Sequence, residues 1–296
     1  MNRRAWLLML LLAALWGASY LFIKVGLDGG LAPLFIVFLR VALGALVLTP
    51  IAWRAGALGT LGGRAGPIVL LAVVQVVLPF ALITFGERHI ASALAGILVS
   101  AVPIVTALIA ARFDADEQPR GIALAGVLLG IAGVVLLFGI DLSGDVEALA
   151  GGLMVLLASV GYAVGLLYLK HRLRGVAPVG VAAWTMIAAS LVLVAFVPFE
   201  LPGRLPDLQT AGAMLGLGAG GTGIAFLVFY TLIADVGPAR AALVTYIAPG
   251  FAVVYGVALL GEPLTLGALL GLAVILTGSF LAAEGRLPWQ ARAASP

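Results

Sequence analysis

The sequence predicts an all-α polytopic membrane protein with ten transmembrane helices, and three observations support this fold class. First, 63% of the 296 residues are hydrophobic and only 10% are charged, against roughly 45–50% and 25% in soluble domains. Second, the charges are bunched, so that long uncharged stretches lie between them. Third, these stretches are uniformly apolar, whereas a membrane β-barrel needs alternating strands. Lipid satisfies no backbone hydrogen bond, which leaves helices as the expected solution.

Ten stretches reach or nearly reach the roughly 20 apolar residues that a helix needs to cross a bilayer. In chain order they are residues 5–23, 29–53, 65–86, 90–111, 121–140, 148–169, 175–199, 208–234, 241–261 and 263–283. Arg3 and Arg4 before the first stretch resemble the start of a secretory signal. That stretch continues to Lys24 and nine more follow, so we expect a retained first helix. The connections are too short for a soluble domain, and any function therefore belongs to the bundle.

The basic residues predict the orientation. With a cytoplasmic N-terminus, twelve of the sixteen lysines and arginines lie on the cytoplasmic side, in agreement with the positive-inside rule. Both termini are therefore expected in the cytoplasm. The twelve are Arg3, Arg4, Arg54, Arg64, Arg112, Arg120, Lys170, Arg172, Arg174, Arg240, Arg286 and Arg292.

Composition excludes several other classes of function. The net charge of +3 is too small and scattered to form a nucleic-acid-binding stripe, so no nucleic-acid partner is expected. The absence of cysteine excludes disulfides, thiol nucleophiles and thiolate metal sites. No lysine lies in a phosphate-binding loop, and the histidines lack a second ligand at metal-binding spacing. We therefore expect no metal, no cofactor and no enzymatic activity; an intramembrane enzyme is the weaker alternative.

An internal repeat divides the chain into two five-helix halves, residues 1–146 and 147–296. Because five is odd, the second half enters the membrane from the opposite side, and the halves form an inverted pair. Such a pair suits a molecule that opens alternately to both sides. At a spacing of 146 the repeat pairs Trp16 with Tyr162, Lys24 with Lys170 and Pro103 with Pro249, and at 145 it pairs Glu117 with Glu262, Gly126 with Gly271 and Gly133 with Gly278.

Helix interruptions at matched positions predict a site near the middle of the membrane. Pro103 and Pro249 each remove one backbone hydrogen bond from the fourth and ninth spans. Pro79 does the same in the third span, and the corresponding part of the eighth is a glycine cluster around Thr222. For any one position, helix packing alone is an adequate explanation. For the matched set of four, we favour a cavity.

Aromatic and polar side chains within the spans complete the predicted substrate-binding set. Trp16 and Tyr20 share one face of the first span, and Tyr162 repeats Trp16 in the sixth. Hydroxyl and amide groups in other spans are further candidates, although each one singly is more often structural. The full set is Trp16, Tyr20, Gln75, Pro79, Ser100, Pro103, Tyr162, Thr222, Tyr230, Tyr246 and Pro249.

Arg40 lies within a span, about 10 Å below the start of its helix, where an unpaired charge is costly. The first interpretation is a structural ion pair with Glu87 or Asp28, and the second is capture of a substrate carboxylate. Lys24 is expected to extend to the interface. No span holds an acidic residue well inside it, so we expect no carboxylate proton relay.

These features resemble the drug/metabolite transporter superfamily, EamA type. The resemblance is carried by ten helices in two inverted halves, Trp-Gly-Ala-Ser at residues 16–19, the stretch 91–103 echoed by 237–249, and Gly-Glu-Pro at 261–263. Within the family the chain looks most like the YddG-type exporters of aromatic amino acids. It departs from the family pattern at Asp116 and Glu117, which lack the glycine that precedes Glu262, and at Tyr162, where the family has tryptophan.

The resemblance implies a central cavity lined by spans 1, 3, 4, 6, 8 and 9. It also implies a secondary transporter in a bacterial inner membrane, which exports small neutral or zwitterionic metabolites, with aromatic or apolar amino acids as the expected substrates. The expected partners are this small molecule and the lipid bilayer, and a monomer is compatible with them. A passive channel is the alternative from another class.

Overall fold

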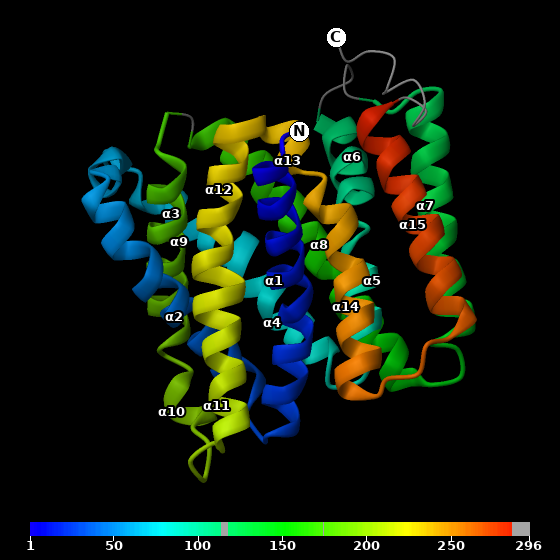
Figure 1. The fold of residues 1–296 in the computed structure, drawn as a ribbon, viewed down its shortest axis with the longest axis horizontal. Coiled ribbons are helices and arrows are strands. Elements are labelled where there is room, and N and C mark those ends of the chain that lie inside the picture. Colours follow the sequence, from blue (N-terminus) through cyan, green and yellow to red (C-terminus); the bar gives the residue numbers. More distant parts are fainter. Residues whose placement is uncertain (114–117, 174, 286–296) are drawn as a thin grey trace.

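The computed structural model describes residues 1–113, 118–173 and 175–285 and shows a bundle of helices (Figure 1). Eight of the described helices are long and apolar enough to cross a membrane, and two shorter apolar helices, Pro178–Leu193 and Val244–Leu260, accompany them. The prediction of a ten-helix membrane protein is confirmed. The elements are α1 (Arg3–Asp28), α2 (Pro33–Arg54), η1 (Ala57–Leu61), α3 (Ala65–Leu71), η2 (Ala72–Val77), α4 (Leu78–Gly86), α5 (Ser92–Val99), α6 (Val102–Phe113), α7 (Ile122–Ile140), α8 (Val146–Arg172), α9 (Pro178–Leu193), α10 (Val197–Glu200), α11 (Leu208–Leu215), η4 (Gly216–Ile224), α12 (Ala225–Val236), α13 (Pro238–Ala241), α14 (Val244–Leu260) and α15 (Leu266–Glu284).

Several spans are built from more than one element. The third consists of α3, η2 and α4, the fourth of α5 and α6, the eighth of α11, η4 and α12, and the ninth of α13 and α14. Helix α1 begins and α15 ends at the same end of the bundle (Figure 1). We call this the terminal end, and the opposite one the far end. Some residues on which the predictions rest lie outside the described residues: Asp116, Glu117, Arg174, Arg286 and Arg292.

The first helix of each half of the chain packs against helices of the other half. Helix α1 packs against α12 and α14, whereas α8, the counterpart of α1 in the repeat, packs against α4 and the α5–α6 pair. Since α4 corresponds to α12 and α5–α6 to α14 at the spacing of 146, the same packing occurs twice. This is the arrangement that a two-fold axis between the halves produces.

Helices α7 and α15 lie side by side at one edge of the bundle (Figure 1), and their interface has the same symmetry. A Cβ atom on Gly133 would lie 2.9 Å from the backbone nitrogen of Ile275, and one on Gly278 would meet the backbone of Gly130. At the spacing of 145, Gly133 pairs with Gly278 and Gly130 with Ile275. Small residues therefore bring the two backbones together at both positions, as in many membrane helix pairs.

The third and eighth spans both contain a π-helical segment. Element η2 covers Ala72–Val77, and the equivalent positions 218–223 lie inside η4. Pro79 follows directly after η2. Wider π turns inside α-helices frequently mark functional sites. The predicted interruptions in these two spans thus take the form of matched π segments.

The fourth and ninth spans are interrupted differently. Helices α5 and α6 are separated at Ser100–Ala101, and Pro103 is the second residue of α6, where a missing N–H costs nothing. In the ninth span, α14 runs continuously through Pro249, and the break lies earlier, at Ala242–Leu243. Pro103 and Pro249 are therefore matched in the sequence, but the helix breaks lie at different positions relative to these two prolines.

Candidate functional site

Arg40 of α2 lies at the centre of the candidate site. Its side chain is buried, with the residue only 8% exposed. The Nε atom donates a hydrogen bond to Oγ1 of Thr222 in η4 at 3.1 Å. The guanidinium carbon lies 3.6 Å from the centroid of the Phe80 ring, in the geometry of a cation–π contact. A threonine and an aromatic ring thus hold the cation from two other spans.

The π segment positions Thr222 for this contact. The Thr222 hydroxyl donates to the carbonyl oxygen of Leu217, five residues earlier, at 3.2 Å, whereas a threonine in an α-helix usually bonds to the third or fourth preceding residue. Gly44, one turn after Arg40, gives the threonine room, because a Cβ there would lie 2.8 Å from Thr222 Cγ2. The widened turn and the missing side chain together bring the hydroxyl to Arg40.

The ion pair predicted for Arg40 is not formed. Asp28 pairs instead with Lys24, at 3.6 Å between Oδ1 and Nζ. Both carboxyl oxygens of Glu87 are buried without a hydrogen-bond partner. Across the part of the chain that the structure describes, no carboxylate lies within ion-pair distance of Arg40. A buried guanidinium without an anion is costly in a membrane.

Two tyrosines complete what we call the Arg40 cluster: Arg40, Phe80, Thr222, Tyr20 and Tyr162. Tyr20 and Tyr162 lie near enough to Arg40 to interact with its charge, and Tyr20 also interacts with Tyr162. The Tyr162 and Phe80 rings make an edge contact at 6.4 Å. The cluster draws on α1, α2, α4, α8 and η4, so five spans from both halves meet at one charge.

A second group of aromatic side chains continues from the cluster toward the terminal end. Trp16 lies one turn before Tyr20 on α1 and contacts Phe229 at 5.3 Å between centroids. Phe229 contacts Tyr230 at 6.1 Å, and Tyr230 stacks on Phe226 at 6.0 Å. We call Trp16, Phe226, Phe229 and Tyr230 the aromatic row. It provides apolar ring faces beside the polar cluster.

Gln75 and Pro79 lie at the seam between the third span and α8. A Cβ on Gly165 would lie 2.5 Å from the Gln75 side chain, and one on Gly161 would lie 2.7 Å from the Pro79 ring. Both predicted residues therefore pack against glycines of α8. This close packing holds Tyr162, which lies between the two glycines in sequence, beside Phe80.

Other predicted residues lie closer to α15 or to the contact between α1 and α14. The Ser100 carbonyl accepts a hydrogen bond from Ser279 Oγ at 2.8 Å. This bond gives a partner to a backbone carbonyl at the break between α5 and α6. The Tyr246 hydroxyl donates to the Ser279 carbonyl at 3.4 Å. Pro249 follows Ala248, whose carbonyl approaches Gly17 of α1. Pro103 is half-buried near the start of α6. These contacts hold helices together, and the structure does not bring these residues into the Arg40 cluster.

A cavity of about 560 Å³ opens at the far end of the bundle. Its volume is within the usual range for small-molecule sites. Charged and aromatic side chains from the ends of α1, α4 and α10 contribute to its wall. We call it the far-end vestibule; its lining includes Lys24, Asp28, Pro33, Phe85, Arg88 and Phe199.

Glu262 has a structural role at the far end that sequence reasoning missed. Its two carboxylate oxygens accept hydrogen bonds from the backbone nitrogens of Ser92 at 2.6 Å and Ala93 at 2.9 Å. A carboxylate at these positions satisfies free N–H groups and matches the helix dipole at the start of α5. The loop between α14 and α15 is thereby fixed to the fourth span. The Gly-Glu-Pro motif at 261–263 was the signal available in the sequence.

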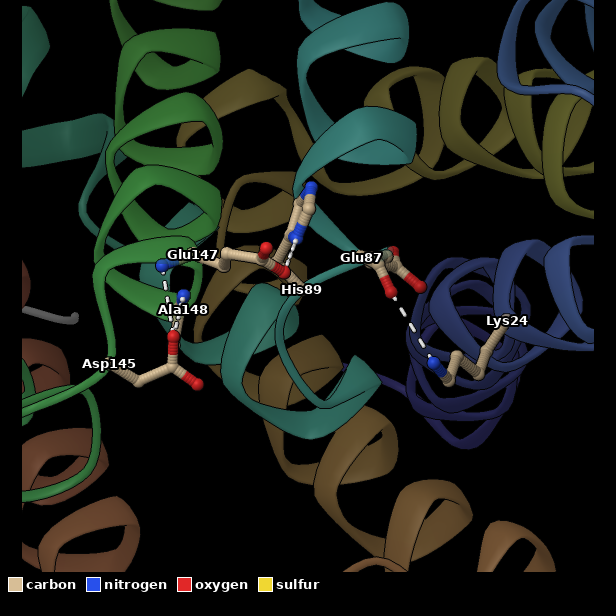
Figure 2. Close-up of polar contacts among 6 residues, drawn as sticks. All are labelled: Lys24, Glu87, His89, Asp145, Glu147 and Ala148. Carbon is tan, nitrogen blue, oxygen red and sulfur yellow. Dashed lines mark hydrogen bonds and ion pairs between the residues drawn. The ribbon is translucent and has the colours of Figure 1, made fainter.

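Further polar contacts order the far end, as Figure 2 shows. The Asp145 carboxylate accepts bonds from Glu147 N and Ala148 N at the start of α8, and Glu147 contacts His89 at 3.3 Å. Lys24 Nζ lies 3.5 Å from the backbone carbonyl oxygen of Glu87 (Figure 2). Lys24 thus contacts the third span, and its extension to the membrane interface stays a prediction.

Phe80, Phe226 and Phe229 are the site residues absent from the predicted set. Phenylalanine is abundant in apolar spans and carries no polar atom, so the sequence did not distinguish Phe80 and Phe226 from lipid-facing ones. Phe80 follows Pro79 directly, and Phe229 precedes Tyr230. Adjacency to a predicted residue was the signal for Phe80 and Phe229, and Phe226 is not adjacent to one.

Comparison with known proteins gives the same family for both halves. The EamA-like transporter family matches residues 3–139 and 149–283. The uncharacterized inner membrane transporter YedA of Escherichia coli (strain K12) is 29% identical, with 94% of this chain and 90% of YedA covered. A probable amino-acid metabolite efflux pump of the same organism is 27% identical, with 98% of each chain covered. A probable terminal-alkyne amino-acid exporter of Streptantibioticus cattleyicolor is 28% identical, with 93% of each covered.

Proposed function

Because the chain belongs to the EamA-like transporter family, we propose that it is a secondary carrier, not an enzyme, that exports small zwitterionic metabolites across a bacterial inner membrane. Amino acids with aromatic or apolar side chains are the proposed substrates. Two relatives whose names refer to amino-acid efflux or export support this substrate class. The inner membrane transporter YedA supports a location in the bacterial inner membrane. The finer resemblance to YddG-type exporters is part of the same proposal.

The observation that carries the proposal is the buried Arg40 guanidinium without a carboxylate. A substrate carboxylate is the anion that such a fork-shaped cation binds best, through two parallel hydrogen bonds. The aromatic row lies beside it, and ring faces there suit an apolar or aromatic side chain. An amino acid offers both groups on one small molecule.

The topology supports alternating access. We place the terminal end in the cytoplasm because most of the basic residues lie there, which puts the far-end vestibule on the outside. Helices α1 and α8 make equivalent contacts in opposite halves. In a carrier built from inverted halves, the two halves exchange conformations, and the molecule then opens to the other side of the membrane.

A counterflow experiment in proteoliposomes tests the function. Vesicles preloaded with unlabelled L-phenylalanine should accumulate external labelled L-phenylalanine transiently with the wild type. The rate should fall about tenfold or more with Arg40→Gln, because a charged hydrogen-bond pair is lost. Arg54→Gln is the matched control, because Arg54 is exposed at the end of the same helix.

The outcomes separate the alternatives. Accumulation that saturates supports a carrier, whereas flux that only equilibrates down the gradient indicates a passive channel. Chemically altered phenylalanine in the lumen would indicate an enzyme. Equal counterflow in Arg40→Gln and Arg54→Gln would contradict the assigned role of Arg40.

A further inference from the structure

Glu87 is a buried acid outside the Arg40 cluster. It follows the last residue of α4, and its residue surface is 0% exposed. Both of its carboxyl oxygens lack a hydrogen-bond partner. The neighbouring Arg88 is exposed, so the burial is specific to Glu87. Glu87 lies just after the end of the third span, so the expectation that no span holds an acidic residue well inside it is not contradicted.

The environment of Glu87 favours the neutral acid. An ionised carboxylate without hydrogen bonds is very costly to bury, and such a group binds a proton instead. Burial raises the pKa of the Glu87 carboxyl well above its ordinary value, and the negative charge of Glu262 raises it further. Lys24 and Arg40 act in the opposite direction and offset only part of this.

The charged and titratable groups around Glu87 come from several elements. Helix α1 contributes Lys24, with its partner Asp28, and Tyr20; α2 contributes Arg40; the loop after α14 contributes Glu262; the segment of Glu87 itself contributes Arg88 and His89. His89 is engaged with Glu147 on α8, and Glu262 is engaged with the start of α5. Lys24 is the cation that touches Glu87, through its backbone carbonyl.

Lys24 also connects Glu87 to water. It lines the far-end vestibule together with Phe85 and Arg88, the residues two before and one after Glu87. Glu87 therefore lies in the chain between two residues of the cavity wall, whereas its own side chain is buried. Release of a proton to the vestibule would require a change of side-chain rotamer, or of the α4 end, that brings the carboxyl oxygens to the cavity and to the Lys24 ammonium.

We propose that Glu87 is a proton-binding site of the carrier, which holds a proton while it is buried and releases it to vestibule water when it pairs with Lys24. On release the carboxylic O–H bond breaks, the proton passes to water, and the carboxylate is stabilised by the ammonium. A conformation that buries Glu87 and one that exposes it therefore differ by one bound proton, and pH shifts the equilibrium between them. This inference rests on the proposed function as a carrier.

The first test measures the protonated acid directly and needs no substrate. Infrared difference spectra of the purified wild type at neutral pH should contain the carbonyl band of a protonated carboxylic acid that is absent in Glu87→Gln. Glu147→Gln is the control, because Glu147 lies at the same end of the bundle with its side chain 81% exposed. A spectrum unchanged by Glu87→Gln would overturn the proposal.

The second test measures the conformational consequence. The chain has no native cysteine, so Phe85→Cys gives one reactive site in the vestibule. Its labelling rate with a membrane-impermeant maleimide should change by about threefold or more between about pH 5 and pH 9. The labelling rate of Phe85→Cys is divided by that of Val146→Cys, a position that is 82% exposed. This division corrects for the pH dependence of the reaction of an exposed thiol with maleimide. In the Glu87→Gln background the normalised rate should be constant.

An equal pH dependence with and without Glu87 would contradict the proposal. Because both tests work without transport, they separate the two inferences. If the infrared band and the labelling change are present but no amino acid is transported, the proposed function fails and the proton site stands.

Discussion

Arg40 and Thr222, which are 182 positions apart in the chain, are joined by a hydrogen bond of 3.1 Å from Nε to Oγ1. The bond crosses from the first half of the chain to the second. It depends on the π segment that contains Thr222 and on Gly44, which admits the threonine next to α2. One hydrogen bond thus links the cation of the site to the interruption of the eighth span.

We expect Thr222→Val to weaken both stability and substrate binding. The valine keeps the shape but leaves the Arg40 Nε–H without an acceptor, and a hydrogen bond to a charged group contributes about 1.5–3 kcal/mol. The measurements are the thermal midpoint and the affinity for L-phenylalanine. Thr277→Val is the control, because that hydroxyl is exposed and bonds only to its own helix. Equal midpoints and affinities in both variants would show that the bond is unimportant.

Much of the fold could be predicted from the sequence, because spans and small-residue contacts depend on local composition. The glycines of α7 and α15 could be matched through the repeat, whereas their contacts with each other's helix are known only from the structure. Arg40 was correctly recognised as a buried charge, but its partner was not, because the contact with Thr222 depends on how α2 packs against η4. The same applies to Glu87: its position suggested a span end, whereas its burial results from the way α4 packs against other helices, α8 among them.

Removing an aromatic ring of the site should weaken binding of L-phenylalanine. Trp16→Ala loses the contact with Phe229, and Tyr162→Ala loses the contact with Phe80. Each should cost about 1 kcal/mol or more in binding free energy, as is typical of aromatic anchors. Calorimetric titration of the purified variants measures this. Trp53→Ala is the control, since Trp53 is 71% exposed; wild-type affinity in both site variants would place the site elsewhere.

Gly278→Ala should destabilise the bundle without touching the Arg40 cluster. The added methyl group meets the Gly130 backbone, so α7 and α15 must separate, and overpacking of this kind costs about 1–3 kcal/mol. The thermal midpoint in detergent should fall. Gly139→Ala on α7 is the matched control, because a Cβ there has open space around it. A midpoint unchanged in Gly278→Ala would mean that the two helices do not pack through these glycines.

The start of α11 should be sensitive to acid. The Asp207 carboxylate accepts the backbone N–H of Thr210 at 2.7 Å, and this bond lowers the pKa of Asp207. A lowered pKa means that the carboxylate stabilises the folded helix start above its ordinary pKa, and that this stabilisation is lost as the pH falls through the folded value.

Amide hydrogen exchange at the first turn of α11 measures this effect. Protection should decrease between neutral pH and about pH 3 in the wild type, after correction for the intrinsic exchange rate. Asp207→Asn should remove the pH dependence, because an amide accepts the same bond and does not titrate. If the two proteins lose protection in parallel, another group is responsible.

The measurement that tests the central claim most directly is the selectivity of binding for a carboxylate. Titration calorimetry compares L-phenylalanine with phenethylamine, which is the same molecule without its carboxylate, in the wild type and in Arg40→Gln. If the Arg40 guanidinium binds that carboxylate, the wild type should prefer L-phenylalanine about tenfold or more, equivalent to about 1.4 kcal/mol. Arg40→Gln should bind the two compounds with similar affinity. An undiminished preference in Arg40→Gln, or no preference in the wild type, would contradict the account.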